Sequence, residues 1–213
     1  MNIIIEKAGK KFNKDWIFRH FSFSFQQGNS YAITGPNGSG KSTLLQVISG
    51  SMNVTQGSVQ YVMNDKPVAT DDVYRHVAIV APYLEVIEEM TAVEFLQFHA
   101  VFKKLILPVD EILSIVQLGH TKGKQIRNFS SGMKQRVKLA QAIFSDVPVV
   151  LLDEPCTNLD KAGYELYHSL INNYCDGKMV IVSSNDVNEY SFCDTIIDVM
   201  AYKNATSRTY GVS

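Results

Sequence analysis

The stretch Gly35-Pro36-Asn37-Gly38-Ser39-Gly40-Lys41-Ser42 is the most informative part of the sequence, because it fits the spacing G-x-x-x-x-G-K-S/T without a mismatch. The apolar run Ser30 to Thr34 before it predicts a short strand, and the apolar spacing of Thr43 to Ile48 predicts a helix after it. A glycine-rich loop between a strand and a helix is typical of a phosphate-binding loop, whose backbone N–H groups face the anion. An ordinary glycine turn capped by Ser42 is the alternative, and the flanking strand and helix argue against it.

Two side chains in this loop have expected roles of their own. Lys41 is placed to reach the β- and γ-phosphates of a nucleotide, and the hydroxyl of Ser42 is placed to ligate Mg²⁺. The loop therefore predicts nucleotide binding, without saying which class of nucleotide-binding protein carries it.

The composition is that of an ordinary globular protein. The chain has 213 residues, 46% hydrophobic and 19% charged, and a formal net charge of −1, which argues against a dedicated nucleic-acid binder. Apolar runs such as Val147 to Leu152 are too short to cross a bilayer, and the N-terminus lacks the features of a signal peptide. Cys156, Cys175 and Cys193 are odd in number and lack metal-site spacing, so we expect reduced thiols in the cytosol. The chain is long enough for one large domain or two lobes.

Hydrophobic patterning divides the chain into three parts. Strand patterns dominate up to residue 84, helix patterns follow from Glu85 to Phe144, and strands and helices then alternate. The expected strands are Asn2 to Lys7, Phe21 to Phe25, Gly57 to Val62, Val77 to Val80, Val147 to Leu152, Met179 to Ser183 and Thr195 to Val199. The expected helices are Val93 to Phe102, Asp110 to Leu118, Tyr164 to Tyr174 and Asn185 to Phe192. This order predicts an α/β core with a helical insertion between its halves.

A second motif ends a strand in two carboxylates. The run from Val149 to Leu152 is continuously apolar and leads into Asp153 and Glu154. An acidic residue at a strand end beside a phosphate loop can hold Mg²⁺, and a neighbouring carboxylate can polarise a water for attack on the γ-phosphate. A strand that merely ends in a polar loop is the alternative, and the phosphate loop upstream favours the nucleotide site.

The third motif, from Asn128 to Arg136, narrows the class of protein. Ser130 and Ser131 can cap the helix that follows, and a helix N-terminus with serine and glycine can also bind an anion. The segment resembles the signature motif of the ABC ATPase family, whose Leu-Ser-Gly-Gly-Gln stands here as Phe129-Ser130-Ser131-Gly132-Met133. The serine and the second glycine of that motif are retained.

The resemblance covers nearly the whole chain. Thr157 to Asp160 resembles the family's D-loop, directly after the two carboxylates. Phe12 stands where the family places an aromatic that stacks on adenine, although a core role is an equal alternative, and Trp16 is a less favoured candidate. Length and motif order are similar to a compact nucleotide-binding domain, as in short ATPases of the haem-exporter type.

The resemblance implies a P-loop NTPase fold: a RecA-like core with a mainly parallel sheet, an N-terminal antiparallel β subdomain and an inserted helical subdomain. Residues 1–84 and 145–200 would form the ATP-binding core with its β subdomain. Residues 85–144 would form the helical signature subdomain, and residues 201–213 a polar tail of poor order. All of them belong to a single ABC ATPase domain, 1–213.

The family also implies a mechanism that needs two chains and uses ATP and Mg²⁺. Two copies, or this chain and a second ABC ATPase, would close head to tail around two ATP–Mg. Asp153 with Ser42 would hold the metal, and Glu154 would be the general base. The expected nucleotide contacts are Asn37, Gly38, Ser39, Gly40, Lys41, Ser42 and Thr43 of one chain, and Ser130 and Gly132 of the other.

The expected partner is an integral membrane permease, which would hold this cytoplasmic chain at the inner face of the cell membrane; no nucleic acid is expected. Glu85, Glu88 and Glu89 lie where family members dock a membrane subunit, and a solvated acidic face is the equal alternative. A force-transmitting ABC ATPase that moves no substrate is a second function. A nucleic-acid or ribosome-associated ATPase is a third, disfavoured by the single cassette and by the short interval from Gly40 to Ser131.

Two residues depart from the family pattern. Pro82 stands where the family has a glutamine, and proline offers neither a side-chain ligand nor an N–H. Asn185 replaces the switch histidine after the strand that ends at Ser183, and asparagine can donate a hydrogen bond but cannot become charged. One interpretation is that these two positions have drifted in this lineage and that neighbouring residues compensate for the change. The other is a slow ATPase, or one that needs a partner to supply the missing groups, with Asn185 in the catalytic set.

Overall fold

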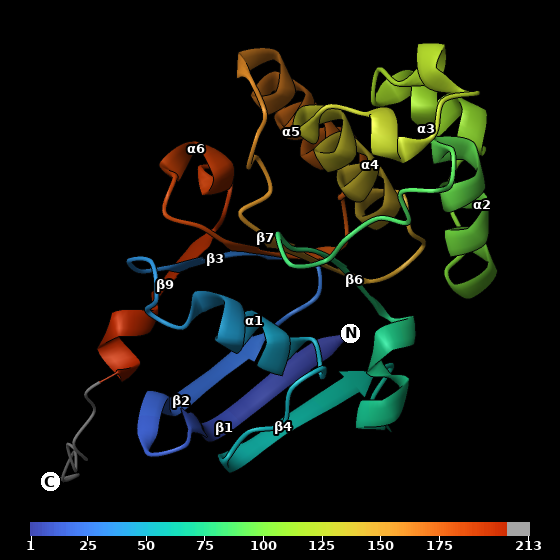
Figure 1. Cartoon of the computed structure of the whole chain (residues 1–213). Helices are drawn as coiled ribbons and strands as arrows, with labels where there is room; N and C mark the ends of the chain where they lie inside the picture. The colour runs from blue at the N-terminus through green and yellow to red at the C-terminus, as the bar shows by residue number, and fades with distance from the viewer. Residues whose placement is uncertain (204–213) are drawn as a thin grey trace, which may run out of the picture.

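The computed structural model describes residues 1–203, which form two β-sheets with helices on both sides of the larger one (Figure 1). The smaller sheet is antiparallel, in the strand order β2-β1-β4-β5. The larger sheet is parallel, in the order β6-β7-β8-β3-β9. The P-loop NTPase fold expected from the sequence is therefore confirmed, with its antiparallel β subdomain and its helical insertion.

The antiparallel sheet begins with a long hairpin. Strands β1 (Asn2–Phe12) and β2 (Asp15–Phe25) are joined by a tight turn in which Asn13 takes a positive φ of 53°. Both strands run further than the apolar patterns predicted, because polar residues continue the ladder on the exposed face. The alternation expected at Phe21 to Phe25 is present, with Phe21 and Phe25 fully buried. Strands β4 (Gln56–Met63) and β5 (Lys66–Val68) and the 3₁₀ helix η1 (Thr70–Arg75) complete this part.

The parallel sheet is buried on both faces, as its continuous apolar runs require. It contains β3 (Ser30–Thr34), β6 (Val77–Val80), β7 (Val149–Asp153), β8 (Met179–Ser183) and β9 (Thr195–Asp198). Along β7 the side chains alternate between the two hydrophobic cores of the protein: Val149 and Leu151 enter one, Val150 and Leu152 the other. Truncating any of these leucines to alanine would cost about 2–5 kcal/mol of stability.

Helix α1 (Lys41–Ile48) lies between the two sheets, and this position fixes the loop that precedes it (Figure 1). Its apolar residues Leu44, Leu45, Val47 and Ile48 are all buried in the core that both sheets share. The helix thus begins at the carboxyl end of β3, next to the ends of β7 and β8, the edge where doubly wound sheets bind their ligands.

The helical insertion covers the opposite face of the parallel sheet (Figure 1). It contains α2 (Ala92–Phe102), α3 (Val109–Ile115), the 3₁₀ helices η2 (Gly119–Thr121) and η3 (Ile126–Asn128), and α4 (Ser131–Ile143). Thr91 and Glu94 form a capping box that begins α2. Helix α3 ends three residues before the predicted Leu118, because Gln117 takes a positive φ of 60° and the N–H of Leu118 bonds back to the carbonyl of Leu113.

The last part of the described chain is more ordered than predicted. Helices α5 (Lys161–Tyr174) and α6 (Val187–Tyr190) separate the final strands, and α6 is shorter than the predicted Asn185 to Phe192. The expectation of a poorly ordered tail from residue 201 is wrong at its start: the 3₁₀ helix η4 (Val199–Tyr202) packs the Tyr202 ring against Phe21, with centroids 4.8 Å apart. Residues 204–213 of that tail lie outside the described residues. No helix in the described range 1–203 is both long and apolar enough to cross a membrane.

Candidate functional site

The glycine loop leaves the first turn of α1 open to an anion. Gly40 is the N-cap of α1 with a left-handed φ of 107°, and within residues 1–203 no side chain caps the helix. A Cβ on Gly40 would collide with Cγ2 of Ile17 from strand β2, so no larger residue fits there. The N–H groups of the first helical turn therefore stay available to a phosphate, which the helix dipole also attracts.

Lys41 lies inside this loop. Its side chain is only 5% exposed, and its Nζ donates to the carbonyl oxygens of Gly35 at 2.8 Å and Pro36 at 3.4 Å. The ammonium group is thereby held over the loop rather than in solvent. Ser39 of the same loop is buried, and its Oγ has no hydrogen-bond partner in the described part of the chain.

The two carboxylates stand at the end of β7, across β8 from the loop. Asp153 pairs in register with Ser183 of β8 and is 2% exposed, and its Oδ1 has no hydrogen-bond partner among residues 1–203. A buried carboxylate oxygen without a partner is costly, which makes it a fit for a cation or for water bound to one. Glu154, the next residue, has a positive φ of 46°, an unusual backbone for a residue with a long side chain.

One cavity brings the loop and the second carboxylate together. It measures about 260 Å³ and is lined by Ile17, Asn37, Gly38, Gly40, Lys41, Ser42, Thr43 and Glu154. Six of the expected phosphate-loop residues and the expected general base thus face the same space. Ser39 and Asp153 are buried and are not part of the lining. A polar cleft with a lysine, a helix N-terminus and a carboxylate suits a nucleotide's phosphate tail.

Asn185, which stands at the switch position, points at the loop. Its Nδ2 donates to Oδ1 of Asn37 at 3.0 Å, and this bond joins the segment after β8 to the phosphate loop. Both asparagines are exposed, so the contact lies at the mouth of the cavity. A side chain that cannot become charged therefore lies beside the phosphate loop at this point.

The second departure, Pro82, is followed by a tyrosine near the buried carboxylate. Burial raises the pKa of the Tyr83 phenol, a hydrogen bond with Gln46 of α1 lowers it, and the charge of Asp153 raises it further. The phenol therefore lies within electrostatic reach of Asp153 and next to α1. A hydroxyl is present in this neighbourhood although the glutamine amide is not.

Neither aromatic candidate for stacking on adenine lines the cavity. Phe12, at the end of β1, is 46% exposed with Nζ of Lys10 5.3 Å from its ring centroid, so the alternative of a core role is wrong. Trp16 packs close to Gly9 and lies against the cations of Lys11 and Arg19. An exposed ring is free to stack on a base, and for Phe12 that role stays a prediction.

The signature residues lie around a different cavity, of about 360 Å³. Ser130 and Gly132 line it with Arg136 and with the D-loop residues Asn158 and Asp160. Ser130 is also the N-cap of α4, where its Oγ accepts a hydrogen bond from the N–H of Met133 at 3.2 Å. The capping role expected of Ser130 is confirmed, and the signature does not face this chain's own phosphate loop.

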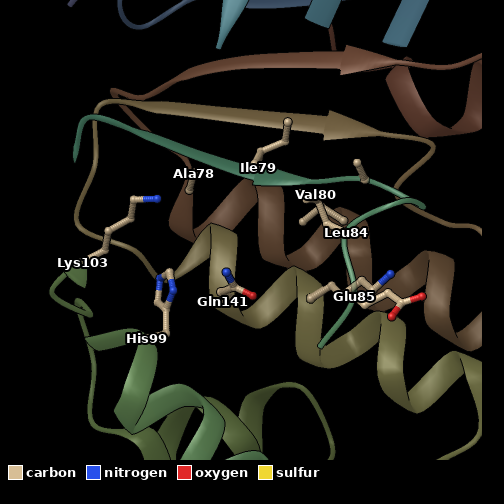
Figure 2. A pocket seen from close by; sticks show the side chains of 10 residues that line it. Ala78, Ile79, Val80, Leu84, Glu85, His99, Lys103 and Gln141 are labelled. Carbon is tan, nitrogen blue, oxygen red and sulfur yellow. The ribbon is translucent and has the colours of Figure 1, made fainter. Parts of the chain in front are cut away.

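A third cavity, of about 140 Å³, lies between edge strand β6 and helices α2 and α4 (Figure 2). The residues that line it are His99 of α2, Lys103 directly after that helix, Gln141 of α4, and Leu84 and Glu85 after β6. Nε2 of His99 is 2.8 Å from Oγ of Ser145, and burial, with the nearby charge of Lys103, lowers the pKa of His99 to about 4. This cavity joins the helical insertion to the sheet and contains none of the expected nucleotide ligands.

The sequence offered no signal for three of these neighbours. Ile17 is one of many apolar residues in a strand, and only the crossing of β2 over the loop places it against Gly40. Tyr83 is likewise a single residue outside any motif. So is Glu189, whose Oε1 accepts a hydrogen bond from the N–H of Cys156, two residues after Glu154. No group of three or more His, Cys, Asp or Glu side chains within residues 1–203 could hold a metal ion alone, so Mg²⁺ here would need hydroxyl, water and phosphate ligands besides Asp153.

Comparison with known proteins identifies relatives along most of the chain. YybJ, an ABC transporter ATP-binding protein of Bacillus subtilis, is 29% identical over 89% of this chain and 88% of its own length. FbpC of Fusobacterium nucleatum, named an Fe(3+) ions import ATP-binding protein, is 30% identical over 75% of this chain, which spans 44% of FbpC. A dimeric ATP-binding cassette solved in a post-hydrolysis state with ADP and Pi shares the fold, with a TM-score of 0.79, 24% identity and coverage of 92% of this chain and 93% of that chain.

The family match covers most of the residues that line the phosphate-loop cavity and the signature cavity. The ABC transporter family matches residues 18–157, a span that includes the phosphate loop, the signature and both carboxylates. The chain therefore belongs to the ABC transporter family.

Proposed function

We propose that this chain is the ATP-hydrolysing subunit of an ABC transporter and that it works as a pair, either of two copies or with a second ABC ATPase. The observation that supports pairing is the separation of the two cavities. The phosphate loop and Glu154 line one, while Ser130 and Gly132 line another. If each cavity is half of a site, a head-to-tail pair completes two sites, with one ATP between each phosphate loop and the opposing signature.

The phosphate-loop half supplies binding and orientation. N–H groups at the start of α1 and the ammonium of Lys41 hold the phosphates, and Asn37, Gly38, Ser39 and Thr43 shape the loop around them. Ser42 and Asp153 would hold Mg²⁺, which when bound neutralises phosphate charge and orients the γ-phosphate. Ser130 and Gly132 of the second chain would cover that phosphate from the other side. The exposed ring of Phe12 is available for the adenine.

Glu154 is the proposed general base. It lines the phosphate-loop cavity, and its left-handed backbone directs it away from the path of β7. Residues kept in such sparsely populated conformations cluster at functional sites. Its carboxylate would accept a proton from the attacking water, and Asn185 would bond at the mouth of the same cavity through Asn37.

A membrane permease is the proposed partner, and it would hold the chain at the inner face of the cell membrane. Supporting this is a group of exposed apolar side chains on helix α2, which we name the α2 surface. It consists of Phe98, Val101 and Phe102, with Val101 78% exposed. Phe98 and Phe102 pack edge to face with centroids 5.3 Å apart. Large exposed apolar patches mark sites of association.

The substitution Glu154→Gln tests this function. We expect the steady-state rate of ATP hydrolysis to fall about 10²–10⁴-fold, the usual contribution of general acid–base catalysis. ATP binding should persist, because the phosphate loop is unchanged, and the variant should form an ATP-dependent dimer. Light scattering after size exclusion, with ATP and with ADP, measures the dimer.

The matched control is Glu165→Gln, an exposed glutamate on α5 that lies outside the cavities described above. It should hydrolyse ATP like the unchanged chain. Normal hydrolysis by Glu154→Gln would remove Glu154 from its role, and a variant that binds ATP but stays monomeric would contradict the shared site.

A slow nucleotide switch is a second candidate function, and Asn185 favours it. Asparagine supplies only a neutral hydrogen bond at the switch position, and Pro82 supplies none at the glutamine position. Such a chain would bind ATP and close as a pair but hydrolyse slowly until a partner completes the site.

A further inference from the structure

The turn that follows the proposed general base is held from three sides. The N–H of Glu154 donates to the carbonyl of Ser183 on β8 at 2.9 Å. Nε2 of Gln135, from the helix that begins at the signature, donates to the carbonyl of Pro155 at 2.6 Å. The N–H of Cys156 donates to Oε1 of Glu189 at 2.8 Å. Glu189 is the one charged group among these three contacts.

Burying the carboxyl group of Glu189 is unfavourable for the free energy of folding. It lies on α6, is 4% exposed, and its Oε2 has no hydrogen-bond partner within the described range 1–203. Burial raises its pKa and the charges of Asp186 and Glu154 add to the rise, while the nearby hydroxyl of Ser184 and the hydrogen bond from the Cys156 N–H lower it. The hydroxyl of Tyr167 donates to the backbone carbonyl of Glu189 at 2.8 Å and fixes α6 in place. An apolar residue would avoid this cost, so a role in packing alone does not account for a carboxyl here.

The segment from Glu154 to Cys156, which these three hydrogen bonds hold, lies between the phosphate-loop cavity and the signature cavity. The positive φ of Glu154 is strained, and a strained backbone persists only where its surroundings hold it. Beyond Cys156 the chain continues to Asn158, whose carbonyl oxygen lies 3.1 Å from where a Cβ on Gly132 would stand. The bond between Cys156 and Glu189 therefore fixes both the base in one cavity and the D-loop wall of the other.

We infer that Glu189 is a positioning residue for ATP hydrolysis, which holds Glu154 and the D-loop in register by accepting the hydrogen bond from the Cys156 N–H. This inference rests on the proposed role of Glu154. It requires that Glu189 affect the rate of hydrolysis and leave the binding of ATP by the phosphate loop unaffected.

Kinetics of the purified full-length chain test the inference with three variants. Glu189→Ala leaves the Cys156 N–H without its acceptor, and we expect kcat to fall about tenfold or more with the Kd for ATP within about twofold of the unchanged chain. Glu189→Gln keeps an acceptor oxygen, so kcat should recover to within about threefold. Glu165→Ala, the exposed control on α5, should have no effect.

Two results would overturn the inference. One is a Glu189→Ala chain with unchanged kcat. The other is a parallel loss of kcat and ATP affinity that Glu189→Gln fails to rescue, since general loosening of the fold would cause that. If Glu189→Ala does not fold, Glu189→Asp keeps the charge but shortens its reach, and the same split between kcat and Kd is expected. Failure of the proposed function is distinguishable, because the unchanged chain would then show no hydrolysis that depends on Glu154.

Discussion

Each of the two cavities is lined by the start of a helix that has serine and glycine near its N-terminus, but the two helices differ in which group bonds their first N–H groups. At α1 the N-cap is Gly40, and no side chain within residues 1–203 caps the first turn. At α4 the N-cap is Ser130, whose Oγ already accepts the N–H of Met133 at 3.2 Å. The first helix start is thus open to an anion, and the second is closed by its own serine.

This difference assigns different roles to the two halves. An open helix N-terminus offers its N–H groups to a phosphate without losing a capping bond, and the ammonium of Lys41, which now bonds the carbonyls of Gly35 and Pro36, lies beside it. A self-capped terminus must exchange a bond it already has for one to a ligand, so it gains little by binding. The phosphate loop should therefore determine the affinity for ATP, and the signature should act only once two chains close.

The largest expected effect separates the two halves directly. Lys41→Ala removes a charged donor from the loop, and we expect the Kd for ATP of the isolated chain to rise about 10–100-fold. Ser130→Ala should leave that Kd within about twofold, lower kcat, and cost α4 about 1 kcal/mol of cap stability. Titration with a fluorescent ATP analogue measures both. An equal loss of ATP affinity in the two variants would contradict the conclusion that the phosphate loop, and not the signature, determines the Kd.

A smaller effect should arise at His99, which lies in neither half. Its folded-state pKa of about 4 is below the ordinary 6.5, so its contribution to stability is complete above pH 6.5. As pH falls from 6.5 towards 4, the unfolded chain takes up a proton that folded His99 excludes. We expect a loss on the order of 1–2 kcal/mol between pH 7 and pH 5 in urea unfolding.

The control for this effect is His99→Gln, which cannot titrate and should lose most of that pH dependence. A variant with the same pH dependence as the unchanged chain would show that His99 is not the responsible group. Because neither half-site contains His99, the ratio of the Lys41→Ala and Ser130→Ala effects on ATP affinity should be the same at both pH values.

The smallest expected effect is a change in kcat when Asn185 or Pro82 is replaced by the residue that the family pattern has there. Asn185→His replaces a neutral donor by one that can become charged, a gain of about 1 kcal/mol, so kcat should rise about three- to tenfold. Pro82→Gln restores an amide near Asp153 and should act in the same direction. Steady-state hydrolysis measures both. Fast turnover of the unchanged chain, unaffected by either substitution, would refute the slow-switch function and favour compensation by neighbours such as Tyr83.

Local chemistry explains why the motifs were predictable. The loop from Gly35 to Ser42 requires glycine at position 40, because Gly40 takes a left-handed backbone and packs against Ile17. The glycine itself therefore signals this backbone in the sequence. The continuous apolar run of β7 is equally legible, since a strand with a core on each face needs apolar residues at every position. Ser130 as an N-cap belongs to the same class of short-range signals.

Contacts between distant segments were not predictable in this way. The exposure of Phe12, the bond between Asn185 and Asn37, and the buried carboxyl of Glu189 each depend on how separate segments meet. Helix boundaries also shifted where a single residue took a positive φ, as Gln117 does after α3. The start of the expected tail became part of η4 because Tyr202 found a partner in Phe21, far away in the sequence.

The phosphate loop and the paired carboxylates after an apolar strand can be read from the residues, because each is a short-range pattern with its own backbone requirement. With the signature they carry the resemblance to the ABC ATPase family, and that resemblance implies the fold class. Which of these motifs share a cavity depends on the tertiary structure. Parallel strand order brings Glu154 to the phosphate loop, whereas the helical insertion holds Ser130 and Gly132 at a separate cavity. Short-range signals can specify a helix start, but only the packing of distant segments determines what that helix start faces.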